Sequence, residues 1–533
     1  MCRGLSCANV EEVVRIVLKE LVGIEPERLP QATFAKYMLL EVGALAQIHV
    51  ATKLVEGEPE ACNTLHSDGT SKKKRGITTY DVCDKCGDSL VVGLHQVALG
   101  DAESQLSLFK EILTDVFEMG EVENTPQAVK NAIVSIKNLM SDRCATQKKF
   151  NELFIQFCKS LLPELLNNRE NLSLDEQNRL ANLNEFFCRL HFIVGLADQA
   201  KVCLKVWESM CFGESKVGSL AHGGYSNGES GITRLVRTVC KSVQEKGCEK
   251  SGRMETFATV MHETHGISNI PSYPFLGNRF NILFLNGAGV FFLYPYFNFF
   301  DELDKENKLL TAVGHDLNVV NYRAGCRALG LIDKLVSGPL WRKMVLEKYA
   351  LNMTAHYKHM LSCFKLWAEN SDPVLSGSVS LFPDHVKKDA RYEKFISRDE
   401  TDEMTKQCLE IIFAGFIVVS TRMLEDHLEG GKLNENVETL EIEASKVAAT
   451  NADPERDFGM LDRYMRNKTK GLYLVNEGLI MFIKNGTGDW RNSLSKEQLK
   501  KVIKIARKSV PKQKNLYFKL KDEIRKAIMQ KDK

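Results

Sequence analysis

The fold is decided by residues 62–100, where three short runs read LHSD (65–68), ITTYDV (77–82) and LVVGLHQ (90–96). β-Branched and aromatic residues are frequent in the second and third runs, which is typical of strands. The segments between the runs, SKKKRG (71–76) and KCGD (85–88), are rich in charged and turn-forming residues. We therefore predict an antiparallel meander of three strands.

The pattern alternates between helix and strand after the meander. A helix is expected to start near Asp101, with its apolar face made of Leu106, Phe109, Ile112, Leu113 and Val116. Residues 132–139 suggest a fourth strand ending at Asp142, and residues 186–191 a fifth strand running into a helix through Trp207. Three strands followed by helix, strand, helix, strand and helix is the order of a ribonuclease-H-like α/β layer.

The chain of 533 residues is too long for one core, so several domains are expected. The expected fold class is α/β plus α, with a mixed five-stranded sheet interrupted by a large, mostly helical insertion domain. The expected domains are an N-terminal helical region (1–60), the first part of the core (61–210), the insertion (211–440), the final core helix (441–490) and a basic tail (491–533).

The composition favours a folded protein. Hydrophobic residues make up 44% of the chain and charged residues 26%, which argues against a disordered protein. No apolar run of about 20 residues stands out, so no association with a membrane is expected. The 15 cysteines are irregularly spaced and too sparse for a disulfide scaffold, which indicates a reducing compartment.

Three acidic residues stand where predicted strands or helices end or begin. Asp68 ends the first strand, Asp142 follows the fourth, and Glu455 opens a helix expected over residues 453–467. Each residue alone has an ordinary alternative as a turn or helix-start carboxylate. Together they would meet at one sheet edge and bind two Mg²⁺ or Mn²⁺ ions, because hard cations prefer oxygen ligands.

The C-terminal residues are strongly basic. Residues 496–533 contain 14 Lys or Arg and four Asp or Glu, a local charge of +10, which leaves −8 for the rest of a chain whose net charge is +2. Such asymmetry favours contact with nucleic acid or nuclear import. The candidate DNA-binding residues here are Lys500, Lys501, Lys504, Arg507 and Lys508. A solvated amphipathic helix is an equally good and compatible interpretation, since Leu499, Val502, Ile503 and Ala506 have helical spacing.

Five motifs in order resemble those of the hAT superfamily of DNA transposases, over roughly residues 60–490. They are DGTS (68–71), without the family's aromatic residue, DRCA (142–145), CRLH (188–191), RF (279–280) in place of the family's Arg-Trp, and PERDFG (454–459). The zinc finger that usually precedes the catalytic core in the family has no counterpart in the sequence.

The resemblance implies a ribonuclease-H-like core that cleaves transposon ends and transfers strands with Mg²⁺ or Mn²⁺. His191 would lie beside the scissile phosphate, Phe280 would stack on a flipped base, and Arg279 would hold a phosphate. The same motifs make Cys188 and Arg456 candidates for DNA contacts. The implied partner is double-stranded DNA, bound by a homo-oligomer in the nucleus. Ordinary alternatives are a helix-start histidine for His191 and core packing for Phe280.

Three functions remain in competition. The first is a transposase, either active or adopted by its host. The second is a non-catalytic nuclear DNA-binding or scaffolding protein that retains the fold. The third is a ribonuclease-H-like nuclease without transposition, which would use the same carboxylates. The presence of Asp68, Asp142 and Glu455 favours an enzyme over a scaffold.

Overall fold

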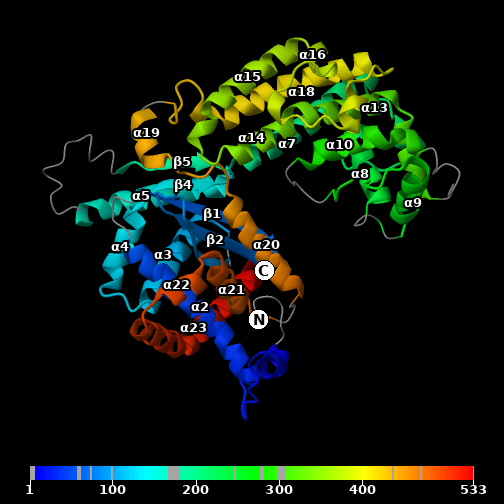
Figure 1. Cartoon of the computed structure of the whole chain (residues 1–533). Helices are drawn as coiled ribbons and strands as arrows, with labels where there is room; N and C mark the ends of the chain where they lie inside the picture. The colour runs from blue at the N-terminus through cyan, green and yellow to red at the C-terminus, as the bar shows by residue number, and fades with distance from the viewer. Residues whose placement is uncertain are drawn as a thin grey trace. The chain divides into compact units, whose positions relative to one another are not determined.

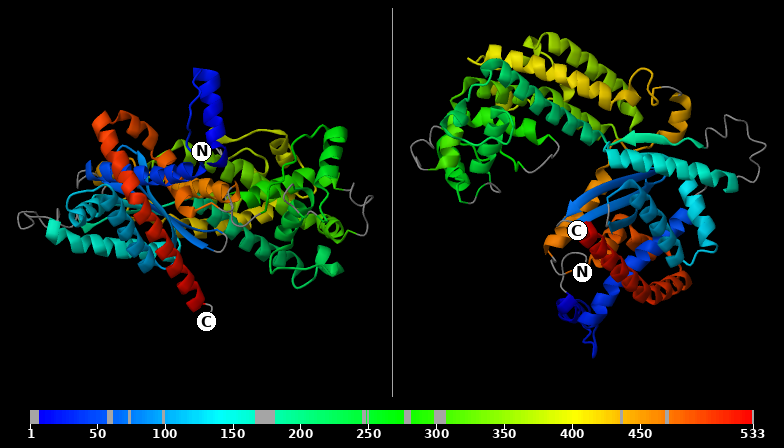
Figure 2. Two further views of the ribbon diagram at one scale, coloured as in Figure 1. Left: turned by 90° about the horizontal axis from the view of Figure 1, so that it is seen from below. Right: turned by 180° about the vertical axis from the view of Figure 1, so that it is seen from behind.

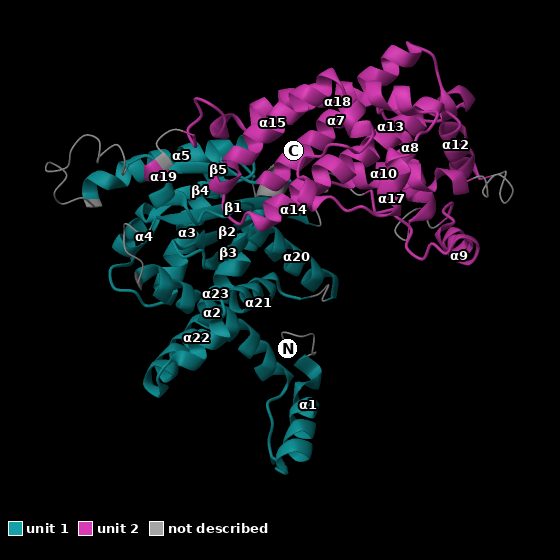
Figure 3. Cartoon of the chain, turned by 45° about the horizontal axis from the view of Figure 1, so that its top comes forward, with its two compact units in different colours: residues 1–188, 441–533 teal, residues 189–440 magenta. Residues whose placement is uncertain are grey.

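The computed structural model describes residues 7–56, 62–72, 75–97, 100–165, 181–244, 248, 250–275, 281–297, 307–434, 437–467 and 471–531. The chain forms two compact units, shown in different colours in Figure 3. Unit 1 combines Met1–Cys188 with Glu441–Lys533, and unit 2 is Arg189–Leu440. The helical unit 2 is thus inserted in the sequence of the unit that contains the sheet.

Unit 1 is built around one five-stranded mixed sheet with strand order β3-β2-β1-β4-β5 (Figure 1). The strands are β1 Asn63–Lys72, β2 Arg75–Cys83, β3 Ser89–Val97, β4 Ile136–Ser141 and β5 Asn184–Phe187. The first three strands form the predicted antiparallel meander, and β4 and β5 run parallel to β1. The predicted mixed sheet of five strands is confirmed.

Three strand positions differ from the predictions. The fifth strand, expected over residues 186–191, is Asn184–Phe187, because α7 already begins at Arg189. β1 does not end at Asp68 but continues to Lys72, because its ladder with β2 extends to the pair Lys72–Arg75. The fourth strand begins at Ile136 and not at residue 132, because Thr125–Val134 forms a helix whose Ala132 and Ile133 pack in the core.

Helices surround the sheet of unit 1. They are α1 Val10–Val17, α2 Ala32–Glu56, α3 Ala102–Met119, α4 Thr125–Val134, α5 Ala145–Leu165, α20 Ala452–Asn467, α21 Tyr473–Lys484, α22 Thr487–Ser493 and α23 Lys496–Lys531. A short helix, α19 Val437–Ala444, spans the boundary between the units. The predicted helix after Asp101 is confirmed as α3, which Asp101 caps by accepting a hydrogen bond from the N–H of Ser104.

The two faces of the sheet carry different side chains. Leu65, Tyr80 and Val82 face α3 and α5, whose Phe109 and Phe150 complete an apolar core. The opposite face packs against α20 and α21. Because side chains alternate along a strand, the polar residues between those core positions face α20, and this is where the candidate site lies.

The exposed edge of β3 is covered by side chains of α21 and the residue after it. The Asn485 amide accepts from the N–H of Val91 at 2.8 Å and donates to its carbonyl at 3.0 Å. Tyr473 donates to the carbonyl of Leu94 at 3.0 Å, and Glu477 accepts from the Leu94 N–H at 3.2 Å. These contacts satisfy backbone groups that an edge strand otherwise leaves open for pairing.

The C-terminal residues form one long helix, α23, which appears red in Figure 2. Its Ala506 packs with Ala44, Leu45 and Ile48 of α2. The amphipathic-helix interpretation is therefore confirmed. The basic tail is part of the folded unit 1 and not a loose extension.

Unit 2 is a helical domain with its own core. Its helices are α7 Arg189–Phe212, α8 Gly231–Val243, α9 Met254–His265, α10 Ile282–Leu293, α12 Lys308–Leu317, α13 Val320–Ile332, α14 Gly338–Leu346, α15 Thr354–Glu369, α16 Asp372–Leu375, α17 Ala390–Ile396 and α18 Asp402–Met423. The unit begins at Arg189 and not at 211, because α7 buries Phe192, Ile193 and Leu196 in this core.

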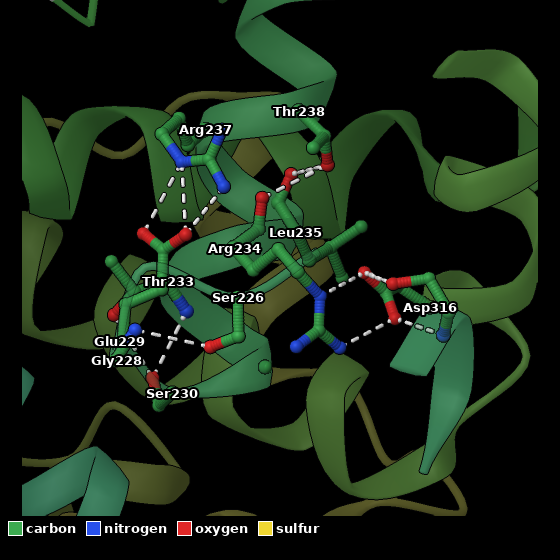
Figure 4. A network of polar contacts seen from close by, with 12 residues as sticks. Ser226, Gly228, Glu229, Ser230, Thr233, Arg234, Leu235, Arg237, Thr238 and Asp316 are labelled. Carbon is green, nitrogen blue, oxygen red and sulfur yellow. Dashed lines mark hydrogen bonds and ion pairs between the residues drawn. The ribbon is translucent and has the colours of Figure 1, made fainter. Parts of the chain in front are cut away.

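A buried ion pair joins α8 to α12 in unit 2 (Figure 4). Arg234 donates two hydrogen bonds to the Asp316 carboxylate, at 2.8 and 2.9 Å, and the two side chains are 2% and 0% exposed. Ser219 donates to the same carboxylate from its N–H at 2.7 Å and from its hydroxyl at 3.1 Å. The additional donors offset the desolvation of the buried charges.

Two helices have the length and composition to cross a membrane, Ala32–Val55 and Asp402–Met423. The sequence analysis identified no such run. In the structure, 56% and 50% of their apolar windows are buried within the protein. Core helices of globular units meet the same criterion.

Replacing Asn485 with Ala tests the covering of the β3 edge. The change leaves the N–H and carbonyl of Val91 without their partner, and each buried unsatisfied group costs about 1–3 kcal/mol. We expect the free energy of unfolding to fall by roughly 2–4 kcal/mol in chemical denaturation. Asn492→Ala, at an exposed position, is the matched control and should change stability little. Equal effects of the two substitutions would contradict the edge-covering role.

Candidate active site

Asp68 lies on the face of the sheet that α20 covers. In the β1–β2 ladder it is opposite Thr79, and His66 is opposite Asp81, so these four side chains share one face. The Asp68 side chain is 5% exposed. Its Oδ1 accepts from the N–H of Gly69 at 2.7 Å, and its buried Oδ2 has no hydrogen-bond partner among the described residues.

Asp142 lies at the same end of the sheet. β1 and β4 are parallel, and the last pair in their ladder is His66 with Met140. Asp68 and Asp142 each follow this pair by two residues. Both carboxylates therefore lie just beyond the last paired residues of β1 and β4. Asp142 is partly exposed, and its Oδ1 accepts from the N–H of Cys144 at 3.2 Å at the start of the turn into α5.

Glu455 is in the first turn of α20 and is exposed. The residue that fixes the start of this helix is Asn451. Its side chain accepts from Nδ1 of His66 at 3.0 Å and donates to the carbonyl of Ser67 at 3.1 Å, and its N–H donates to Sγ of Cys188 at 3.2 Å. One asparagine thus attaches α20 to β1, next to Asp68, and to the end of β5.

The three carboxylates interact electrostatically. Burial is the main cause that raises the pKa of Asp68 to about 8, and the negative charges of Glu455 and then Asp142 raise it further, against the hydrogen bond from Gly69. Residues 68, 142 and 455 come from distant parts of the sequence. The charges of Glu455 and Asp142 nevertheless act on the single buried carboxyl of Asp68.

The donor chemistry of this group suits a hard divalent cation. All three side chains offer carboxylate oxygens, and Asp68 has a buried oxygen without a partner. Among the described residues, however, no three His, Cys, Asp or Glu side chains are arranged closely enough to hold one metal ion. Mg²⁺ or Mn²⁺ held by Asp68, Asp142 and Glu455 therefore remains a prediction.

A second pair of acids, which the sequence analysis missed, lies on the same face. Asp81 of β2 and Asp457 of α20 are both fully buried. Burial raises the pKa of each, and the charge of Asp457 raises the pKa of Asp81 further. Nζ of Lys484 lies 3.7 Å from Asp457 and 3.2 Å from Asp453. The sequence contained one signal for this pair. Asp81 stands inside the predicted strand ITTYDV (77–82), and a carboxyl buried in a strand needs a partner.

The remaining predicted residues from the family motifs have varied surroundings. Cys188 is 3% exposed and its sulfur accepts from the N–H of Asn451, so its side chain has a structural role, and its predicted DNA contact stays a prediction. His191 is partly buried in the first turn of α7, in unit 2. Arg456 is exposed and donates to Asp453 at 3.1 Å. Arg279 and Phe280 lie outside the described residues.

The predicted cations of the C-terminal residues all lie on α23. Lys500, Lys501, Lys504, Arg507 and Lys508 are exposed. Arg507 also lies 3.2 Å from the Glu41 carboxylate of α2. The helix therefore presents a positively charged surface while its apolar side, with Ala506 and Val510, is buried.

Comparison with known proteins leaves the family open. No protein-family model matches the chain, and no curated protein matches it.

Replacing Asp68 with Asn tests its raised pKa. In the unfolded chain Asp68 ionises near its ordinary pKa of 3.8, whereas the metal-free folded protein holds the proton up to about pH 8. Asp68 therefore lowers stability progressively as the pH rises through this interval, by about 1.4 kcal/mol at most for each pH unit. We expect Asp68→Asn to be more stable than the native protein at pH 8 and equal to it near pH 4, measured by denaturation in EDTA.

Added Mg²⁺ provides the complementary measurement. A cation bound by Asp68 would stabilise the ionised carboxyl, so Mg²⁺ should raise the melting temperature of the native protein at pH 8 and leave that of Asp68→Asn unchanged. An equal response of both proteins would place any bound Mg²⁺ elsewhere.

Proposed function

We propose that the protein is a Mg²⁺- or Mn²⁺-dependent polynucleotidyl transferase of the transposase type, with a ribonuclease-H-like core that cleaves double-stranded DNA. The observation that supports this most strongly is the action of Glu455 and Asp142 on the buried Asp68. The strand order β3-β2-β1-β4-β5 also agrees with the order expected for such a core.

Each group has a distinct role in this proposal. Asp68, Asp142 and Glu455 would hold the metal ions, which would supply an activated water and stabilise the leaving oxygen of the phosphodiester. Asn451 is a positioning residue, because it fixes the start of α20 against β1. His191, at the beginning of α7, contacts a phosphate, as the resemblance to hAT transposases implies.

The exposed cations of α23 bind the DNA backbone in this proposal. Lysine and arginine neutralise phosphates whatever the base sequence, and binding then weakens as salt concentration rises. We further propose that the protein acts on transposon ends as a homo-oligomer in the nucleus. These last features rest on the five motifs and their resemblance to hAT transposases.

Two other functions use parts of the same arrangement. A ribonuclease-H-like nuclease would need the same three carboxylates but no strand transfer. A DNA-binding scaffold would need only the surface of α23. The raised pKa of Asp68 favours an enzyme, because a scaffold gains nothing from a buried carboxyl that costs stability.

Substitution of the two aspartates tests catalysis. Asp68→Asn and Asp142→Asn keep the side-chain shape but lose the charge that holds the metal, so we expect Mg²⁺-dependent nicking of plasmid DNA to fall at least 100-fold. Asp462→Asn, further along α20 than Glu455, is the matched control and should retain full activity. Nicking that survives in both variants would assign the chemistry to other residues, and nicking without joining would favour the nuclease.

Neutralising the surface of α23 tests DNA binding without removing the helix. The quadruple variant Lys500→Gln, Lys501→Gln, Lys504→Gln and Lys508→Gln keeps the buried side intact, unlike a deletion. We expect weaker binding to all sequences alike and a log–log salt dependence lower by about one unit for each phosphate that is no longer neutralised. The control replaces four exposed lysines of unit 2, Lys358, Lys365, Lys387 and Lys388, with Gln. An unchanged salt dependence in the α23 variant would exclude this surface.

A further inference from the structure

A cavity of about 420 Å³ lies in unit 1 between α23 and the elements that support the β3 edge. Helices α3, α21 and α23 provide most of its walls, and β3 contributes His95 and Gln96. Its volume falls in the range of small-molecule sites, about 300–1,000 Å³. The cavity lies beside an edge strand, whereas Asp68 lies on the central strand, and the proposed catalytic function makes no use of it.

The walls combine apolar side chains with an excess of acids. Six carboxylates line the cavity, against three lysines and one histidine. The carboxylates are Glu111, Asp115, Glu118, Glu121, Glu477 and Glu523. Two of them are neutralised by partners, since Glu477 lies 2.9 Å from Nε2 of His95 and Glu118 lies 2.6 Å from Nζ of Lys512.

Glu111 and Asp115 have no ion-pair partner within the part of the chain that the structure describes. They stand four residues apart on α3, on the same face as the apolar Leu108 and Ile112. Glu111 is exposed and Asp115 is half-buried. Burial is the main cause that raises the pKa of each, the charge of Asp115 raises the pKa of Glu111 further, and the charge of His95 lowers both in part. A cation placed directly beside these two carboxylates would add to the partial compensation that His95 provides.

One polar side chain in the cavity wall provides a separate indication of a ligand. Gln96 is 6% exposed and lines the cavity, and its buried amide nitrogen has no hydrogen-bond acceptor among the described residues. A buried N–H group without an acceptor is costly, so such groups are normally satisfied. A ligand oxygen in the cavity would supply the acceptor.

We propose that this cavity binds a small organic cation: an amine with an apolar body and an oxygen that accepts a hydrogen bond. The ammonium group lies between Glu111 and Asp115, the apolar body packs on Leu108 and Ile112, and the oxygen accepts from Gln96. Because α23 forms much of the wall, the bound amine also holds this helix on unit 1.

A series of three six-carbon probes tests the proposal with the full-length protein. 6-Aminohexan-1-ol carries the ammonium and the hydroxyl, hexane-1,6-diol is its neutral analogue, and 6-hydroxyhexanoate is its anionic analogue. We expect the amine to bind at least tenfold more tightly than the diol in calorimetry or ligand-observed NMR, and the carboxylate to bind more weakly than both. Equal binding of the three probes would overturn the proposal.

Variants locate the binding. The double variant Glu111→Gln, Asp115→Asn should bring the affinity for the amine down to that for the diol, and Gln96→Ala should weaken both. Glu103→Gln, an exposed acid on the same helix outside the cavity, is the matched control. Leu108→Trp fills the cavity and should abolish binding. Unchanged affinity in both the double variant and Leu108→Trp would show that the amine binds elsewhere.

Discussion

The attachment of α20 to the sheet of unit 1 depends on one buried asparagine. Asn451 bonds His66 and Ser67 of β1 and the sulfur of Cys188 at the end of β5. These partners precede it by more than 250 residues, and the whole of unit 2 lies between them in the sequence. Without these bonds, the start of α20 would lose its polar attachments to β1 and to the end of β5, and the position of Glu455 relative to Asp68 would be less closely fixed. Further along the helix, Asp462 would still lie 3.9 Å from Nζ of Lys72 in β1.

The same face of the sheet holds more charge than an apolar core tolerates. His66, Asp68, Asp81 and Asp457 are all buried there, and Lys484 compensates only part of the negative charge. Burial lowers the pKa of His66 and raises that of the acids, so protons replace charges over much of this face. Such an arrangement reduces stability, and proteins retain it mainly where a function requires it.

Much of the fold could be predicted because the sheet has a clear local signal. Strand-forming and turn residues located β1, β2 and β3, and helical periodicity located α3. The fourth strand was predicted to begin too early in the chain. Residues 132–134 are apolar, and a short apolar run is compatible with a buried helix as well as with a strand. The positions of Asp142 and Glu455 followed from element order, but Asn451 did not, because its role depends on contacts with residues remote in sequence. The cavity could not be predicted for the same reason, since its walls come from residues 47–121 and 473–523.

The covering of the β3 edge has a consequence for biosynthesis. All five strands have been synthesised by residue 187, but Tyr473, Glu477 and Asn485, which cover the edge, are made almost 300 residues later. During that time unit 2 can fold on its own core, while the nascent sheet exposes an unpaired edge that is prone to join other chains. Helix α21, which covers the β3 edge, is thus synthesised late. Its packing on the sheet ends the period in which the risk of aggregation is greatest.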